Sequence, residues 1–199
     1  MYKDHMTLIH ELKEYASPKA RLTRMIQSGD VIQVRRGVFL DSTDHDYSLK
    51  SMASVIYGPS YISFEYALSH YGMIPERALA ITSAVFNKNK NRRFHTPLGD
   101  FYYYYLPVEV YPYGIVREEE NGQGYLIATR EKALLDALYK VRGISTVTAL
   151  SSLLFEDWRM DSETIQNLDH ESIAFMAPLY RKTIMALLID LLERGNSHA

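Results

Sequence analysis

The side chains best suited to chemistry lie near the N-terminus, within residues 17–40. Between residues 19 and 27, basic, hydroxyl and amide groups recur with helical spacing, and such groups donate hydrogen bonds to phosphates and base edges. On a helical wheel the apolar side chains Leu22, Met25 and Ile26 share one face. The opposite face holds Ala20, Thr23, Arg24 and Gln27, with Lys19 and Arg21 on its flanks. This slim polar face is typical of a helix that enters the major groove of DNA.

Two adjacent arginines follow in a predicted β-hairpin. The runs VIQV and VFL indicate short strands, joined at Arg35-Arg36-Gly37, where Gly37 can adopt the positive φ of a tight turn. A basic hairpin tip after a recognition helix matches the wing of a winged helix-turn-helix. We therefore predict that Thr23, Arg24 and Gln27 face base edges. Lys19, Arg21, Arg35 and Arg36 would contact phosphates. The alternative is a small helical module with solvated basic residues.

The elements that position these side chains have their own start and stop signals. Helical spacing of Leu8, Leu12 and Tyr15 predicts a first helix over residues 5–16. A second helix is predicted to begin after Ser17, whose side chain would cap it, and to end at Gly29. Only two helices fit ahead of the hairpin. We therefore predict a winged helix-turn-helix-like module over residues 1–41, shortened by one helix.

Composition describes an ordinary globular chain. Of its 199 residues, 47% are hydrophobic and 23% are charged, and no cysteine is present. The net charge is -2, yet residues 1–40 carry seven Lys or Arg against four Asp or Glu. Any nucleic-acid surface should therefore lie toward the front. The longest late apolar run, Ile184–Ile189, is far shorter than a membrane span, so we expect a cytoplasmic protein without membrane contact.

Residues 47–199 are predicted to form a second, α+β domain. Helical patterns cover 47–56 and the segment from Ser63 to Gly72, and strand-like runs cover 78–86, 93–96, 101–111 and 125–128. Glycine turns between the runs favour hairpins, and hence an antiparallel or mixed sheet. From Thr129 onward the pattern is helical to the C-terminus, with Pro178 expected to kink or split the last helix.

Two further charged segments raise alternatives. The run Asn87–His95 contains four basic residues and no acid. It is either a second surface for nucleic acid or a protein partner, or a solvated hairpin loop. Its basic residues are Lys88, Lys90, Arg92 and Arg93. In the helix that begins after Thr129, the residues Lys132, Asp136 and Lys140 form a charge ladder at i, i+4 spacing. We favour a structural role for this ladder over catalysis.

The sequence contains no recognisable enzyme motif. The seven histidines are scattered, and the glycines of NGQGY lack the remaining features of a dinucleotide fingerprint. The run Tyr102–Tyr105 must alternate between the two faces of a strand, which favours cross-strand packing over a base-stacking platform. We therefore predict no catalytic residue, no metal and no cofactor.

Several blocks in this order resemble the AbiEi-type antitoxin family of type IV toxin–antitoxin and abortive-infection systems, whose members are also described as predicted regulators of viral defence. They are RLTRMIQSGDVIQVRRGVFL, SYISFEYALSHYGMIPE, ITSAVF, RRFHTPLGDFYYYYL and YLIATREKALLDALY. The resemblance covers residues 17–139. It implies an N-terminal winged helix-turn-helix, binding to inverted repeats in the protein's own promoter, and functional rather than stable neutralisation of a nucleotidyltransferase toxin.

Two rival functions belong to other classes. The missing first helix suggests a protein-interaction module that acts on a toxin partner without binding DNA. A phosphotransfer or nucleotide-processing enzyme would instead use Asp136 and Glu131, although no partner acid or base is evident in the sequence.

Overall fold

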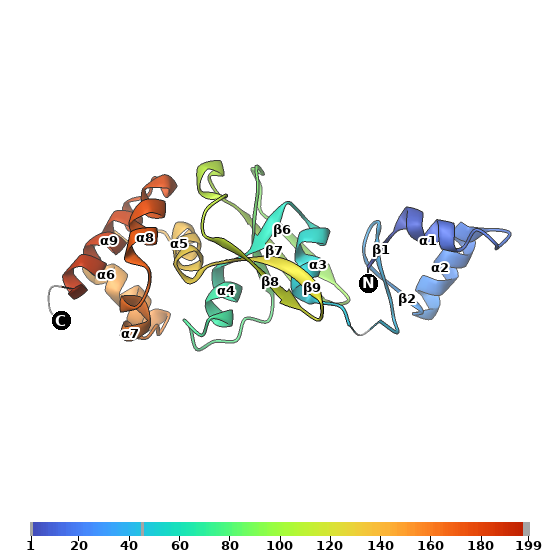
Figure 1. Cartoon of the computed structure of the whole chain (residues 1–199), viewed down its shortest axis with the longest axis horizontal. Coiled ribbons are helices and arrows are strands. Elements are labelled where there is room, and N and C mark those ends of the chain that lie inside the picture. The colour runs from blue at the N-terminus through green and yellow to red at the C-terminus, as the bar shows by residue number, and fades with distance from the viewer. Residues whose placement is uncertain (1, 45, 197–199) are drawn as a thin grey trace.

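The computed structural model describes residues 2–44 and 46–196. Three parts follow one another along the long axis of the molecule: an N-terminal module, a sheet flanked by helices, and a helical C-terminal part (Figure 1). Antiparallel and mixed sheets coexist with many helices, so the predicted α+β class is confirmed.

The N-terminal module is a pair of helices backed by a three-stranded antiparallel sheet. Its elements are β1 (Lys3–Asp4), α1 (His5–Glu11), α2 (Pro18–Ser28), β2 (Val31–Arg35) and β3 (Val38–Asp41). The strand order is β1-β3-β2, because Lys3 pairs with Phe39. Strand β1 was absent from the sequence-based prediction, since two residues give no period. Helix α1 is also shorter than the predicted 5–16: Leu12 caps it, and Tyr15 lies in the following turn.

Helix α2 has the predicted bounds, with one difference at its start. Pro18 occupies the first turn and Gly29 ends the helix at a φ of 81°, in the left-handed region that favours glycine. Ser17 makes no side-chain capping bond, so that prediction is wrong. Pro18 at the first helical position has no N–H, so this helix end has one fewer donor without an intrahelical partner.

The central sheet has six strands in the order β6-β7-β5-β4-β9-β8. Its strands are β4 (Ser60–Ile62), β5 (Ile81–Val85), β6 (Arg92–Thr96), β7 (Gly99–Tyr105), β8 (Ile115–Glu120) and β9 (Gln123–Ala128). The pairs β5–β7 and β4–β9 are parallel, and the others are antiparallel. The predicted hairpins at PLGD and NGQG are therefore confirmed, and of the two predicted alternatives, antiparallel or mixed, the sheet is mixed.

The two helices beside this sheet were predicted more accurately than some of its strands. Helices α3 (Leu49–Ile56) and α4 (Phe64–His70) fall where they were predicted. The short β4 and the charged β8 were missed, because neither shows a clear alternation of apolar residues. The predicted strand over 101–111 was too long: β7 ends at Tyr105, and the 3-10 helix η1 (Val108–Val110) follows Pro107.

The C-terminal part is helical, as predicted. It comprises α5 (Arg130–Lys140), α6 (Val147–Ser152), the π-helical turn η2 (Leu153–Asp157), α7 (Ser162–Gln166), α8 (His170–Met176), the 3-10 turn η3 (Ala177–Tyr180) and α9 (Thr183–Asn196). Pro178 lies in η3 and separates α8 from α9, so the predicted split is confirmed. Helix α5 lies between the sheet and the remaining helices (Figure 1).

Two hydrophobic clusters stabilise the fold. The small cluster joins the two front helices to their sheet through Leu8, Leu12, Leu22, Val31 and Phe39. The large cluster runs through the sheet and C-terminal helices, and it also includes two residues of the hairpin, Val34 and Leu40. The hairpin therefore packs on both clusters and fixes the front module against the sheet domain.

Candidate nucleic-acid interface

Helix α2 presents the polar face that the sequence predicted. Leu22 is buried in the small cluster, and Met25 and Ile26 pack beside it. The opposite face is exposed to solvent along its whole length. Its exposed members are Lys19, Ala20, Thr23, Arg24 and Gln27. The structure thus brings together every residue assigned to base edges, on one face of one helix.

Two of these side chains are held close to the helix by their own backbone. The Thr23 hydroxyl donates to the Lys19 carbonyl at 3.0 Å, and Arg24 Nε lies 3.4 Å from the Ala20 carbonyl. The Arg24 guanidinium has further N–H groups that this contact does not use. These local bonds hold both side chains against the helix. The Thr23 hydroxyl keeps only its acceptor lone pairs for another partner, whereas Arg24 keeps most of its donors.

Lys19 and Arg21, the cations that flank the polar face of α2, differ in their exposure to solvent. Lys19 is exposed, and among the described residues it has no ion-pair partner. Arg21 is half-buried, and its guanidinium lies 5.2 Å from the centre of the Tyr15 ring. The ring restricts the rotamers available to Arg21. Of the two predicted phosphate contacts, Lys19 is therefore the more accessible.

The two turn arginines occupy different environments. Arg35 is the last residue of β2, and its Nη1 donates to the carbonyl oxygen of Ile56 at the end of α3. The same guanidinium lies 5.6 Å from the centre of the Phe94 ring. Arg36 is exposed at the tip beside Gly37, whose φ is 83°. The geometry therefore joins Arg35 to the sheet domain and directs Arg36 to solvent.

The second basic segment lies close to this turn. Phe94 packs on Tyr57 with ring centres 5.7 Å apart, and Lys88 Nζ lies 5.8 Å from the Tyr57 ring centre. Lys90, Arg92 and Arg93 are exposed, and the Arg93 guanidinium lies 5.1 Å from the centre of the Tyr102 ring. The contacts of Arg35, Phe94, Tyr57 and Lys88 bring the loop before β6 near the hairpin. Sequence reasoning gave no signal for this proximity, because it depends on the tertiary packing of the hairpin.

The tyrosine run of β7 alternates as expected. Tyr103 is fully buried and donates to the Ala53 carbonyl at 2.7 Å, and its ring packs against Tyr57 and Phe94. Tyr102 and Tyr104 lie on the other face, where Arg93 and Lys140 approach their rings. Packing, rather than a continuous stacking platform, explains this run.

The charge ladder of α5 is only partly as predicted. Lys132 and Asp136 form an ion pair at 3.3 Å, and both side chains are inaccessible to solvent. Lys140 instead pairs with Glu65 of α4 at 2.7 Å. Buried charges require nearly complete hydrogen bonding, so the surroundings of the first pair decide its role.

Hydroxyl groups complete the buried pair. Asp136 Oδ2 accepts from Tyr61 at 2.9 Å and from Ser63 at 2.6 Å, and Oδ1 accepts from Tyr180. Lys132 Nζ donates to the Val110 carbonyl at 2.7 Å and to Tyr180 at 2.9 Å. These five side chains, from Tyr61 to Tyr180, are the α5 network. It joins the sheet to η3, and no substrate can reach it without local opening.

Burial dominates the proton affinities in the α5 network. It raises the pKa of Tyr61 and of Tyr180 well above that of free tyrosine, and the Asp136 charge acts in the same direction. Burial also lowers the pKa of Lys132, although Asp136 opposes that shift. Glu131, the other candidate for catalysis, accepts a hydrogen bond from the Asp169 backbone N–H at 3.1 Å. Both acids thus make contacts that connect elements of the fold.

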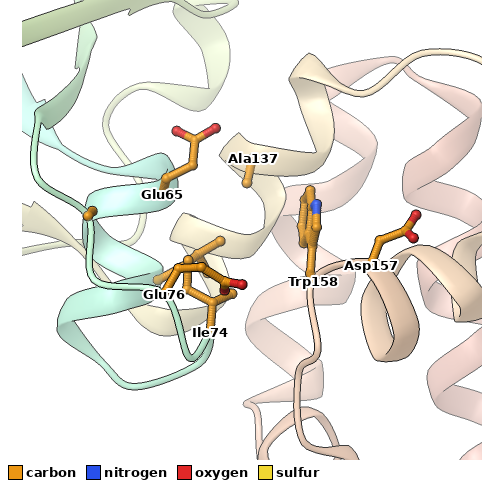
Figure 2. A pocket seen from close by; sticks show the side chains of 8 residues that line it. Glu65, Ile74, Glu76, Ala137, Asp157 and Trp158 are labelled. Carbon is orange, nitrogen blue, oxygen red and sulfur yellow. The ribbon is translucent and has the colours of Figure 1, made fainter.

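A hollow of about 250 Å³ lies where α4 and α5 meet the C-terminal helices. Figure 2 shows Glu65 and Glu76 on one side of it and Trp158 on the other. Its floor is apolar, and two of its acids are ion-paired, Glu65 with Lys140 and Glu76 with Arg159. The hollow therefore coincides with a junction that ion pairs hold together.

No protein-family model matches the chain, and no curated protein matches its sequence significantly. The described part of the chain contains no helix that is both long and apolar enough to cross a membrane. The function of the chain must therefore be inferred from the geometry and chemistry of its own residues.

Proposed function

We propose that the chain is an antitoxin and autorepressor whose N-terminal module binds promoter DNA as a winged helix-turn-helix. The observation that carries this proposal is the exposed face of α2, where Thr23, Arg24 and Gln27 project together beside a hairpin tipped by Arg36. Base-edge donors on a slim helix and a cation on an adjacent turn suit a major groove and its flanking phosphates.

The arrangement of the module supports this assignment. Helices α1 and α2 would be the two helices of the helix-turn-helix, and β2 and β3 would form the wing. Strand β1 pairs with β3 on the side away from β2, which gives the hairpin a third strand. A three-stranded sheet anchored in both hydrophobic clusters holds the turn rigidly relative to α2.

The target and the toxin are expectations from the family resemblance. The proposed operator is an inverted repeat in the chain's own promoter, so two copies of the module would read two half-sites. The proposed toxin is a nucleotidyltransferase, counteracted by function rather than by a stable complex. Lys88, Lys90 and Arg92 could extend the DNA surface, because Lys88 is joined to Arg35 through Tyr57 and Phe94.

A gel-shift titration of the upstream promoter tests the DNA-binding proposal. Arg36→Ala should weaken binding and make the salt dependence shallower by about one counterion. The matched control is Arg117→Ala, which removes an exposed arginine from β8 at the far edge of the sheet. Absence of promoter binding at low salt would contradict the proposal. Equal binding and equal salt slopes for Arg36→Ala and the control would contradict the wing assignment.

One observation favours a second candidate, an interaction module that acts on a toxin without binding DNA. Arg35 is engaged by Ile56 and Phe94, so of the two turn arginines only Arg36 faces solvent freely. This candidate predicts that co-expression rescues cells from the neighbouring toxin even when the chain has no promoter affinity. Loss of rescue in a variant that has lost only DNA binding would contradict it.

A further inference from the structure

A second hollow, of about 350 Å³, lies at the C-terminal end of α5. Its lining combines three cations with three tyrosines, which belong to β7, to α5 and the residues after it, and to the residue just before α9. The cations are Lys140, Arg142 and Lys182, and the tyrosines are Tyr104, Tyr105 and Tyr139. We call this the α5 basic pocket. It is separate from the α2 face, because α5 lies on the far side of the sheet from the front module (Figure 1).

The cations of the pocket are only partly compensated. Lys140 pairs with Glu65 at 2.7 Å, and its Nζ lies 3.9 Å from the centre of the Tyr104 ring. Lys182 Nζ donates to the carbonyl oxygens of Tyr139 and Val141, which caps the end of α5 but adds no negative charge. Arg142 is exposed and has no hydrogen-bond or ion-pair partner among the described residues. Two of the three positive charges therefore lack a carboxylate.

Repulsion between cations is evident at Lys182. Burial lowers the pKa of this amine, and the Arg142 charge lowers it further. An anion placed between the two side chains would relieve that repulsion and would gain charge-assisted hydrogen bonds from both. A lysine ammonium has three donors, and the two carbonyls use two of them, so one remains for the anion.

The tyrosines differ in how much of their rings is covered. Tyr104 packs against Phe64 and Lys140, and Tyr139 packs against Tyr180 and Lys182. Tyr105 is 43% exposed at the end of β7 and makes no ring contact with another described aromatic or cationic side chain. A partly exposed tyrosine ring beside two cations that lack a carboxylate is suited to stacking a nucleobase.

We propose that the α5 basic pocket binds a nucleoside phosphate. Arg142 and Lys182 hold the phosphate, and the base stacks on Tyr105. Lys140 remains paired with Glu65 and takes no direct part. The source of this ligand is a free nucleotide or the terminal nucleotide of a strand, which share the chemistry that these residues recognise. This site does not depend on the proposed DNA interface.

Isothermal titration calorimetry of the full chain at low salt tests the site with four probes: AMP, ATP, adenosine and inorganic phosphate. Both nucleotides should bind, and adenosine should bind at least tenfold more weakly. Arg142→Ala should weaken AMP binding about tenfold or more, because it removes a charge-assisted bond. Tyr105→Leu should weaken AMP binding several-fold and leave phosphate binding unchanged.

Controls separate the pocket from other basic surfaces. Arg117→Ala removes an exposed arginine at the opposite edge of the sheet and should leave the AMP affinity unchanged. Arg36→Ala should also bind AMP normally, even where it has lost promoter binding. If Arg142→Ala and Arg117→Ala bind AMP equally, or if no probe gives saturable binding, the proposal is overturned.

The source of the ligand is resolved by a 5′-phosphorylated tetranucleotide and its 5′-hydroxyl counterpart. Tighter, Arg142-dependent binding of the phosphorylated strand than of AMP assigns the pocket to strand ends. Equal or weaker binding of the strand assigns it to free nucleotides. Phosphate binding as tight as AMP binding would overturn the role of Tyr105.

Discussion

Helices α2 and α5 are both eleven residues long and both carry basic side chains, yet their charges are used in opposite ways. In α2 only Leu22 is fully buried, and the described cations of the helix form no ion pairs. In α5 seven consecutive residues are buried, including Lys132 and Asp136. The loss of one partner from a buried pair leaves an uncompensated buried charge, whereas exposed charges without partners are available to a ligand.

This difference separates structural motifs from recognition motifs more clearly than residue type does. The block around Lys132 and Asp136 has the more noticeable charge pattern in the sequence, but these two side chains bind each other and buried groups of other elements. The polar face of α2 resembles an ordinary solvated helix face. Apart from the bonds of Thr23 and Arg24 to the helix backbone, no contact in the described fold uses its polar groups. Substitutions in the two helices should therefore affect different measurements.

The largest effect should come from Asp136→Ala in α5. The substitution leaves Lys132 charged and buried, and it removes the acceptor of three hydroxyl groups. Breaking such a pair reduces the free energy of unfolding by about 3–5 kcal/mol. Urea denaturation followed by circular dichroism measures this loss. DNA affinity, measured under conditions where the variant is folded, should stay within about twofold of the wild type.

The exposed pair in α9 provides the control for Asp136→Ala. Asp190 and Arg194 have the same i, i+4 spacing, with Nη2 and Oδ2 2.8 Å apart, but both side chains are exposed. Asp190→Ala should change the free energy of unfolding by only about 0.5 kcal/mol. Similar losses for Asp136→Ala and Asp190→Ala would contradict the structural role of the α5 network.

In α2, the double variant Arg24→Ala/Gln27→Ala should lose promoter affinity and keep its stability. Each substitution removes a donor proposed to contact a base edge, and a good contact of this kind contributes about 1–3 kcal/mol of discrimination. Promoter affinity in a gel shift should therefore fall at least tenfold. The free energy of unfolding should change by less than about 0.5 kcal/mol, because both side chains are exposed. Unchanged affinity would remove α2 from the interface.

The α5 network should also be visible in the pH dependence of stability. Because folding raises the pKa of Tyr61 above that of free tyrosine, near 10, its contribution is complete below pH 10 and is lost as pH rises further. Tyr61→Phe lacks this loss. The stability difference between wild type and Tyr61→Phe should thus shrink by up to about 1.4 kcal/mol per pH unit above pH 10. A constant difference from pH 9 to pH 11 would contradict the raised pKa.

The sequence predicts local features of both helices well. The bounds of α2, the hairpin turn at Gly37, the Thr129 cap of α5 and the split at Pro178 follow from residues near one another in the chain. Strand β1 could not be predicted from the sequence, because two residues show no periodicity and the strand is defined by its pairing with β3. Helix α1 ends before the predicted Ala16: Leu12 is its C-cap and lies in the small cluster.

The sequence-based prediction also missed contacts between residues that lie far apart in the chain. The i, i+4 spacing identified Lys132 and Asp136, but their burial depends on Tyr61 and Tyr180, which lie far away in the chain. Lys140 has the same spacing and pairs with Glu65 instead. For the candidate interface, the face of α2 was predictable from periodicity, whereas the contact of Arg35 with Ile56 was not.

The adjacent residues Arg35 and Arg36 repeat the contrast between α5 and α2, and the stability difference between their variants should be smaller than that between the variants of the two helices. Arg35→Ala removes a charged donor to the Ile56 carbonyl and a contact with Phe94, so it should reduce the free energy of unfolding by about 1–2 kcal/mol. Arg36→Ala should leave stability unchanged and reduce the salt slope of promoter binding by about one. Denaturation and salt titrations of both variants check this division. Equal loss of stability in the two variants would mean that the turn arginines share one structural role, and it would remove the wing from the proposed interface.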